Sequence, residues 1–215
     1  MIGPYRDRAE AGRILAHALE AFRDWKHALV LGLPRGGVPV AFEVAEVLHL
    51  PLDVFVVRKL GLPGQEELAM GALAQGEVVV FNEEVLAMAR PGELAVERVL
   101  QRERQELRRR VEAYRGDRPP LDVKDRTLIL VDDGLATGAT MRAAIRALRS
   151  QGPASIVVAV PVAPPDTCEE LAREVDLLVC PRRPEHFSAI GQWYEEFGQT
   201  SDDEVRACLG HARVP

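Results

Sequence analysis

The chain has 215 residues, of which 47% are hydrophobic and 28% are charged, and this composition is typical of a globular protein rather than a disordered one. Its length fits one domain with an appendage. With 27 basic and 33 acidic residues, the formal net charge is −6. Such a balance disfavours a protein held on nucleic acid by a general positive field, although local loops can still bind small anions.

No segment of the sequence predicts a membrane span or an export signal. The charge-free run over 150–165 contains four prolines and is shorter than the ~20 residues that a spanning helix needs. The first residues lack an apolar signal core. The three cysteines, Cys168, Cys180 and Cys208, form no CxxC pair, which argues against a disulfide framework or a zinc site and favours a cytoplasmic location.

The first half of the chain alternates between helical and strand-like apolar patterns. We expect, in chain order, a helix over 8–25, a strand over 28–33, a buried helix over 38–48, a strand over 52–57 and a strand over 77–81. Between the last two strands, Gly61, Pro63 and Gly64 predict a loop, because glycine and proline interrupt regular structure.

A charged segment over 92–116 predicts a long helix with a narrow apolar stripe, since Leu100, Leu107 and Tyr114 recur every seven residues. Two interpretations remain open. The helix either projects from the domain to pack on a partner, or it lies on the surface and is docked by one face.

Strands and helices alternate in the second half of the chain. We expect a strand over 127–131, a helix over 139–150, a strand over 155–160, a helix over 166–174 and a strand over 176–180. Strands separated by helices form βαβ units, so the sequence predicts an α/β protein with an open parallel sheet.

The most informative segment covers residues 131–140, Val-Asp-Asp-Gly-Leu-Ala-Thr-Gly-Ala-Thr, between a predicted strand and a predicted helix. Small and hydroxylated residues at a helix N-terminus can turn their N–H groups toward an anion. The two carboxylates suit a vicinal diol, since each accepts hydrogen bonds from hydroxyl groups. An anion site beside a diol site matches ribose 5-phosphate. The segment is neither a P-loop nor a dinucleotide fingerprint.

This segment resembles the phosphoribosyl-pyrophosphate (PRPP) motif of type I phosphoribosyltransferases, and the wider resemblance covers about residues 26–82 and 124–190. It implies an open parallel sheet flanked by helices. It also implies a single domain over 1–215, with a small hood built from the chain termini, whose C-terminal part is about 182–215, and a helical insert at about 83–120.

The resemblance further implies roles for individual residues. Asp132 and Asp133 would hold the ribose hydroxyls and would approach Mg²⁺ through substrate or water. The 5-phosphate would bind at Ala136, Thr137, Gly138, Ala139 and Thr140. The pyrophosphate would bind at Pro34, Arg35, Gly36 and Gly37, with further contacts from Arg58 and Lys59. The stretch 60–75 would form a flexible loop that closes over the site, and Phe187 would stack on the base.

Two departures bear on the acceptor. Hypoxanthine-type relatives carry an aspartate just before the Thr-Gly of the loop, where this chain has Ala136. A lysine that would read an oxopurine is also not evident after the strand that ends at Val160. Hypoxanthine or guanine specificity is therefore in doubt, and a single alanine does not establish adenine.

The implied function is a PRPP-dependent glycosyltransferase that moves ribose 5-phosphate to a nucleobase or similar nitrogen nucleophile, as in nucleotide salvage, with Mg²⁺ as cofactor. Its partners would be small molecules rather than nucleic acid or membrane, and the long helix is compatible with a homodimer. The alternative is a regulator that senses PRPP on the same fold without catalysis. A third interpretation, an unrelated nucleotide-binding α/β protein, does not explain the spacing of diol and anion sites.

Overall fold

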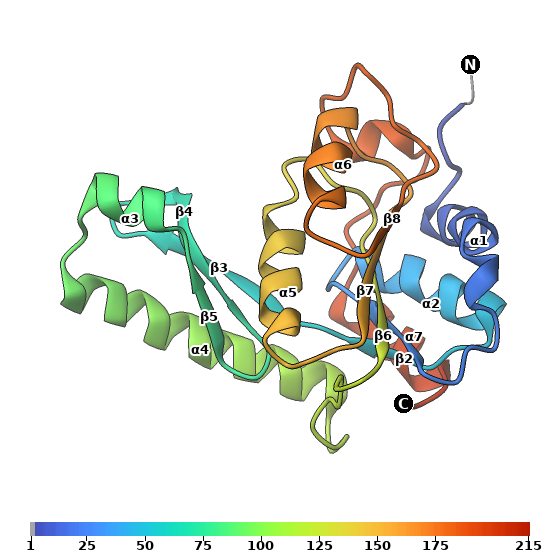
Figure 1. The fold of residues 1–215 in the computed structure, drawn as a ribbon, viewed down its shortest axis with the longest axis horizontal. Coiled ribbons are helices and arrows are strands. Elements are labelled where there is room, and N and C mark those ends of the chain that lie inside the picture. Colours follow the sequence, from blue (N-terminus) through green and yellow to red (C-terminus); the bar gives the residue numbers. More distant parts are fainter. Residues whose placement is uncertain (1–2) are drawn as a thin grey trace.

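Five short apolar segments form a parallel sheet in the computed structural model, which describes residues 3–215. The strands are β1 (Ala28–Gly32), β2 (Leu52–Val54), β6 (Thr127–Val131), β7 (Ser155–Ala159) and β8 (Leu177–Val179), in the order β2-β1-β6-β7-β8 (Figure 1). Every residue of β1 and β6 is buried, as expected of central strands covered on both faces. The predicted α/β fold is confirmed.

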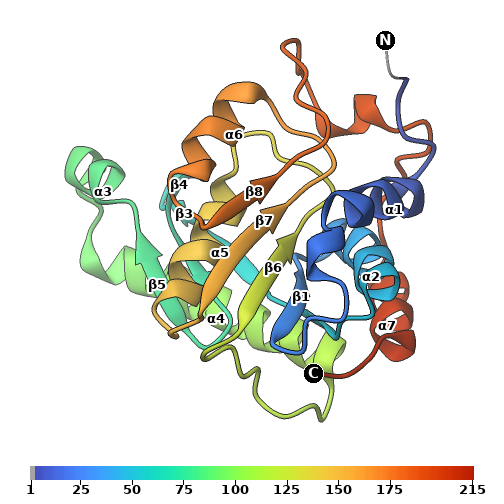
Figure 2. The same cartoon turned by 45° about the vertical axis from the view of Figure 1, so that its right-hand side comes forward.

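Helices cover both faces of this sheet. One face packs against α1 (Arg8–Ala18), α2 (Gly37–Leu48) and α7 (Asp202–His211), and the other against α5 (Ala139–Arg149) and α6 (Pro165–Ala172) (Figure 2). Alternate residues of the strands supply the two cores: Val30 and Ile129 point into the first, and Leu31 and Leu130 into the second. Within residues 3–215, no helix is both long enough and apolar enough to cross a bilayer.

A second, antiparallel sheet projects from the first together with two helices (Figure 1). It contains β3 (Val57–Leu62), β4 (Gln65–Ala74) and β5 (Val78–Phe81), and the chain continues into α3 (Glu83–Ala89) and α4 (Glu93–Arg115). We call residues 57–115 the arm. One face of α4 packs on β3 and β4, and its apolar stripe is buried. The one-face interpretation of this helix is therefore confirmed.

The loop expected over 60–75 is wrong as secondary structure, because most of it forms the β3–β4 hairpin. Only Pro63 and Gly64 make the turn, with Gly64 at φ +81°. The other glycines permit close strand contact: a Cβ on Gly61 would lie 2.6 Å from the Glu66 carbonyl oxygen, and one on Gly71 would lie 2.5 Å from that of Val80. Hinge-like composition here reflects tight pairing of strands.

Other boundaries differ at segment ends. The first helix stops at Ala18 and a 3₁₀ helix follows at Glu20–Phe22, so the predicted 8–25 helix is too long. The predicted 52–57 strand ends at Val54, and Val57 already belongs to the arm. The helices α3 and α7 were not predicted, although Ser201 and Glu204 form a capping box at the start of α7.

Candidate functional site

The site is positioned by the direction in which the chain crosses the sheet. From β1 the chain moves outward to β2, whereas from β6 it moves the opposite way to β7 and β8. Ligands of open parallel sheets bind where these directions diverge, at the carboxyl ends of the strands. Here that point lies between β1 and β6. The segments leaving these two strands are 33–36 and 132–138, which contain most of the predicted site residues.

These two segments touch each other directly. The Leu33 N–H donates to the Val131 carbonyl oxygen at 2.9 Å. A Cβ added to Gly36 would lie 2.1 Å from Oδ2 of Asp133, and one on Gly37 would lie 2.7 Å from the Val131 oxygen. The peptide bond between Pro34 and Arg35 is cis. The two glycines let the predicted pyrophosphate segment lie against the acidic pair.

The acidic pair is held in a defined arrangement. Asp133 is 8% exposed, and its Oδ2 accepts hydrogen bonds from the Arg8 guanidinium at 2.9 Å. The Asp133 N–H donates to Oδ1 of Asp132 at 2.9 Å. Burial, together with the adjacent Asp133 carboxylate, raises the pKa of Asp132. Burial also raises the pKa of Asp133, and Arg8 opposes that shift. Hydroxyl donors from a ligand would stabilise both carboxylates as anions.

Three residues that the sequence did not assign to the site support this pair. Arg8 also donates to the Gly198 carbonyl oxygen at 2.8 Å, and its guanidinium lies 4.1 Å from the centre of the Phe197 ring. The Tyr194 hydroxyl donates to the Asp133 carbonyl oxygen at 2.5 Å. From the sequence, Tyr194 and Phe197 were core candidates, and no local pattern marked Arg8, since its partner is 125 residues away.

The segment 136–140 begins α5 with its backbone open to solvent. Gly138 is the N-cap residue at φ +70°, a conformation that favours glycine. Ala136, Thr137, Ala139 and Thr140 are exposed. Behind the loop, the Thr167 hydroxyl on α6 donates to the Ala136 carbonyl oxygen at 2.8 Å. An exposed helix N-terminus with two nearby hydroxyl groups is suited to bind a phosphate.

The basic pair predicted to contact pyrophosphate is divided between two faces of β3. Arg58 points to α4, where its guanidinium lies 2.7 Å from Oε2 of Glu103, whose side chain is 8% exposed. Lys59 instead lines a cavity, and its Nζ donates to the Glu67 carbonyl oxygen at 2.5 Å. Neighbouring strand residues face opposite sides, so the structure does not bring both cations to one place.

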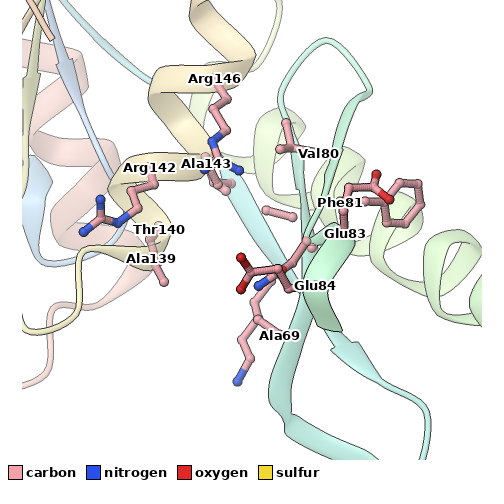
Figure 3. Close-up of a pocket in the computed structure, with 15 residues that line it drawn as sticks. Ala69, Val80, Phe81, Glu83, Glu84, Ala139, Thr140, Arg142, Ala143 and Arg146 are labelled. Carbon is pink, nitrogen blue, oxygen red and sulfur yellow. The ribbon is translucent and has the colours of Figure 1, made fainter. Parts of the chain in front are cut away.

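The cavity lined by Lys59 has a volume of about 470 Å³ and lies between the arm and α5. Ala139 and Thr140, from the predicted phosphate segment, line the opposite wall (Figure 3). Glu84, at the start of α3, faces them across the cavity (Figure 3). Lys59 and the phosphate segment therefore border the same space, as a shared PRPP site would require.

A second cavity, of about 400 Å³, adjoins Asp133 on the side of the C-terminal segment. Arg8, Arg35, Gly36 and Phe197 are among its lining residues. Arg35 is held loosely there, since its Nη1 lies 3.8 Å from Oδ1 of Asp202. Phe187 lines neither cavity. It stacks on Trp193, with ring centres 6.5 Å apart, in a small apolar cluster.

Comparison with known proteins identifies the family. A family model described as "Phosphoribosyl transferase domain" matches residues 6–181. The chain belongs to this family, and the resemblance inferred from the segment 131–140 is confirmed.

Two individual proteins are closely similar. One is a Mycobacterium tuberculosis protein named "Putative phosphoribosyl transferase Rv0571c", which is 47% identical over 208 residues. That match covers 97% of this chain but 47% of the relative, so the chain spans about half the length of the curated relatives it matches. The other is the solved structure of TT1426 from Thermus thermophilus, which is 43% identical; the match covers 98% of this chain and 99% of that one, with a TM-score of 0.84.

Proposed function

We propose that this chain transfers ribose 5-phosphate from PRPP to a nitrogen nucleophile and releases pyrophosphate. The observation that supports this most is the direct contact of the segments after β1 and β6, where Gly36 lies against the Asp133 carboxylate. A diphosphate beside one segment and a 5-phosphate at the other would leave the ribose between them, next to Asp132 and Asp133. That is the order of groups in PRPP.

Catalysis at such a site would rest on position and charge. Asp132 and Asp133 would orient the ribose hydroxyls. Lys59 and Arg35 would neutralise charge that develops on the leaving pyrophosphate, since a preorganised cation stabilises a transition state more than a mobile one. The segment 136–140 would fix the 5-phosphate and so hold the reacting carbon in place. Arg58 is better described as a structural partner of Glu103.

The donor set bears on the magnesium ion that we expect with PRPP. Within residues 3–215, no group of three or more His, Cys, Asp or Glu side chains is arranged to hold a metal. The carboxylates of Asp132 and Asp133 fit a supporting role, because Mg²⁺ commonly binds through phosphate oxygens and water with one or two carboxylates. The ion would neutralise diphosphate charge when bound, and these two side chains would contact it directly or through water.

The test is pyrophosphate release from PRPP and Mg²⁺ with each of a panel of nucleobases and other nitrogen acceptors. The matched variants are Asp132→Asn/Asp133→Asn and, as control, Asp122→Asn, an exposed carboxylate that accepts a hydrogen bond from the nearby Lys124 N–H. We expect acceptor-dependent release that falls at least ~100-fold in the double variant, about 2.7 kcal/mol of transition-state stabilisation, and is unchanged in the control.

Two other results would overturn catalysis in different ways. Tight PRPP binding, lost in the double variant, with no release on any acceptor would support the PRPP-sensing regulator. Failure of the folded wild-type chain to bind PRPP at all would exclude both. The acceptor itself is left to the panel, because Ala136 and the stacked position of Phe187 select no base.

A further inference from the structure

Two of the three cysteines lie together behind the proposed phosphate segment. Cys168 is on α6 and is 1% exposed, and Cys180 follows the end of β8 and is 8% exposed. Both belong to the same apolar core cluster. Their thiols are in hydrogen-bonding contact, and Sγ of Cys180 lies 3.1 Å from the Arg182 carbonyl oxygen. In both views α6 lies beside β8 (Figures 1 and 2).

The helix that carries Cys168 also supports the proposed phosphate segment. Thr167, the preceding residue, donates its hydroxyl to the Ala136 carbonyl oxygen at 2.8 Å. A Cβ on Gly138 would lie 3.1 Å from Leu171 Cδ1 and 3.3 Å from Thr167 Cγ2, so α6 packs directly on this segment. A change in the position of α6 would therefore reach the loop through Thr167 and Leu171.

We propose that Cys168 and Cys180 form a reversible disulfide that acts as a redox modification site and weakens PRPP binding. The effect on PRPP rests on the proposed function, whereas formation of the disulfide does not. A disulfide brings two Cβ atoms to about 3.8 Å and fixes the torsion about the S–S bond. Oxidation would thus tie α6 to the end of β8 and displace the hydroxyl that holds Ala136.

The chemistry balances with a peroxide as oxidant. The Cys168 thiolate attacks one oxygen of hydrogen peroxide, the O–O bond breaks, and sulfenic acid and hydroxide form. The Cys180 sulfur then attacks the Cys168 sulfur and displaces hydroxide, which takes up the thiol proton and leaves as water. Overall, two thiols lose two electrons and two protons, and one peroxide becomes two water molecules. A thiol reductant reverses the reaction by exchange.

The surroundings suit this order of steps. The hydrogen bond from Cys180 and the nearby Arg183 guanidinium lower the pKa of Cys168, which increases its thiolate fraction near neutral pH. The hydrogen bond with Cys168 and burial raise the pKa of Cys180, so it remains a thiol until it resolves the sulfenic acid. Cys180 keeps part of its surface exposed, which leaves the pair within reach of a small oxidant.

The experiment treats the reduced, folded protein with hydrogen peroxide, blocks free thiols and analyses a non-reducing tryptic digest. The sequence places the cysteines on three separate peptides, 150–173, 174–182 and 207–213. We expect a cross-link between the first two that dithiothreitol removes. Cys208→Ser is the matched control and should retain the link. In Cys180→Ala, Cys168 should be trapped as a sulfenic acid by a 1,3-dione probe.

PRPP binding is then measured on reduced and oxidised protein. We expect at least a fivefold weaker affinity after oxidation, restored by reduction and absent in Cys168→Ala. Links to peptide 207–213, links between chains, or no link would overturn the modification site. A 168–180 link that leaves PRPP affinity unchanged would overturn its effect on the loop. If the reduced chain does not bind PRPP, the proposed function fails, and the digest still decides the disulfide.

Discussion

Gly36 shows how a single missing atom brings two segments together. Its backbone, at φ −60° and ψ −31°, lies in the ordinary helical region, so alanine would be free of backbone strain there. The space is what excludes a side chain, since the added Cβ would lie 2.1 Å from Asp133 Oδ2. Arg8 holds that carboxylate in place, which limits how far it can retreat.

Gly36→Ala therefore tests the arrangement of the proposed site without altering a charge. We expect PRPP affinity to fall at least tenfold, because the Asp133 carboxylate must move away from the ribose position. Overpacking should also lower the free energy of unfolding by about 1–3 kcal/mol. Calorimetric titration and urea unfolding measure the two effects. Gly210→Ala, where nothing lies within 4 Å, is the control and should change PRPP affinity by less than ~2-fold. Unchanged affinity in Gly36→Ala would place PRPP elsewhere.

Arg8 marks the limit of what the sequence could predict at this scale. The segments 33–37 and 131–140 were recognisable, because turn glycines, paired acids and small hydroxylated residues are local signals. Arg8, Tyr194 and Thr167 act through contacts with residues far along the chain. No local spacing records such contacts, so only the folded structure could bring these three residues to the site.

At the scale of elements, apolar periodicity predicted the buried strands and the longest helix well. It failed in the arm, where glycines that permit strand pairing had the same composition as a mobile loop. The same difficulty affected Arg58 and Lys59. As neighbours in sequence they were expected to act together, but a strand directs them to opposite faces, and that follows only once β3 is known to continue through them.

Arg58→Gln and Lys59→Gln should therefore behave differently. Loss of Lys59 should raise KM for PRPP or lower kcat, with kcat/KM down at least tenfold and little change in stability, because its ion pair with Glu67 is exposed. Loss of Arg58 removes the closest guanidinium from the buried Glu103 and leaves it the contact with Arg102, so we expect about 1–2 kcal/mol of destabilisation. Its kcat/KM should stay within about twofold.

Steady-state kinetics and urea unfolding of both variants provide the comparison. Glu103→Gln is the matched partner of Arg58→Gln and should reproduce its loss of stability without affecting PRPP. If Arg58→Gln reduced kcat/KM as strongly as Lys59→Gln, the guanidinium would have to leave Glu103 when PRPP binds, and the sequence-based assignment of Arg58 to pyrophosphate would be correct.

For the whole molecule, the main question is what fixes the arm to the parallel sheet. The end of α4 is joined to β2 by a buried ion pair between Arg115 and Asp53, whose side chains are 7% and 1% exposed. Arg115 contacts both carboxylate oxygens at 3.0–3.2 Å, and Nη1 of Arg118 lies 4.0 Å from Oδ1 of Asp53. This carboxylate therefore compensates two guanidinium groups at the junction.

Asp53→Asn should lower the free energy of unfolding by about 3 kcal/mol, because it leaves Arg115 charged and buried without its counter-ion. Urea unfolding measures this, with Asp203→Asn as the control: that carboxylate is 88% exposed in its pair with Arg206, and its loss should cost less than about 1 kcal/mol. The double variant Asp53→Leu/Arg115→Met removes both charges and should recover part of the stability, since well-packed apolar residues often replace a buried pair at little cost. Hydrogen exchange would then locate the effect. Faster exchange confined to α4 and the arm strands would show that the pair fixes the arm, whereas uniform acceleration across β1, β6 and β7 would show that the arm and the sheet unfold as one unit.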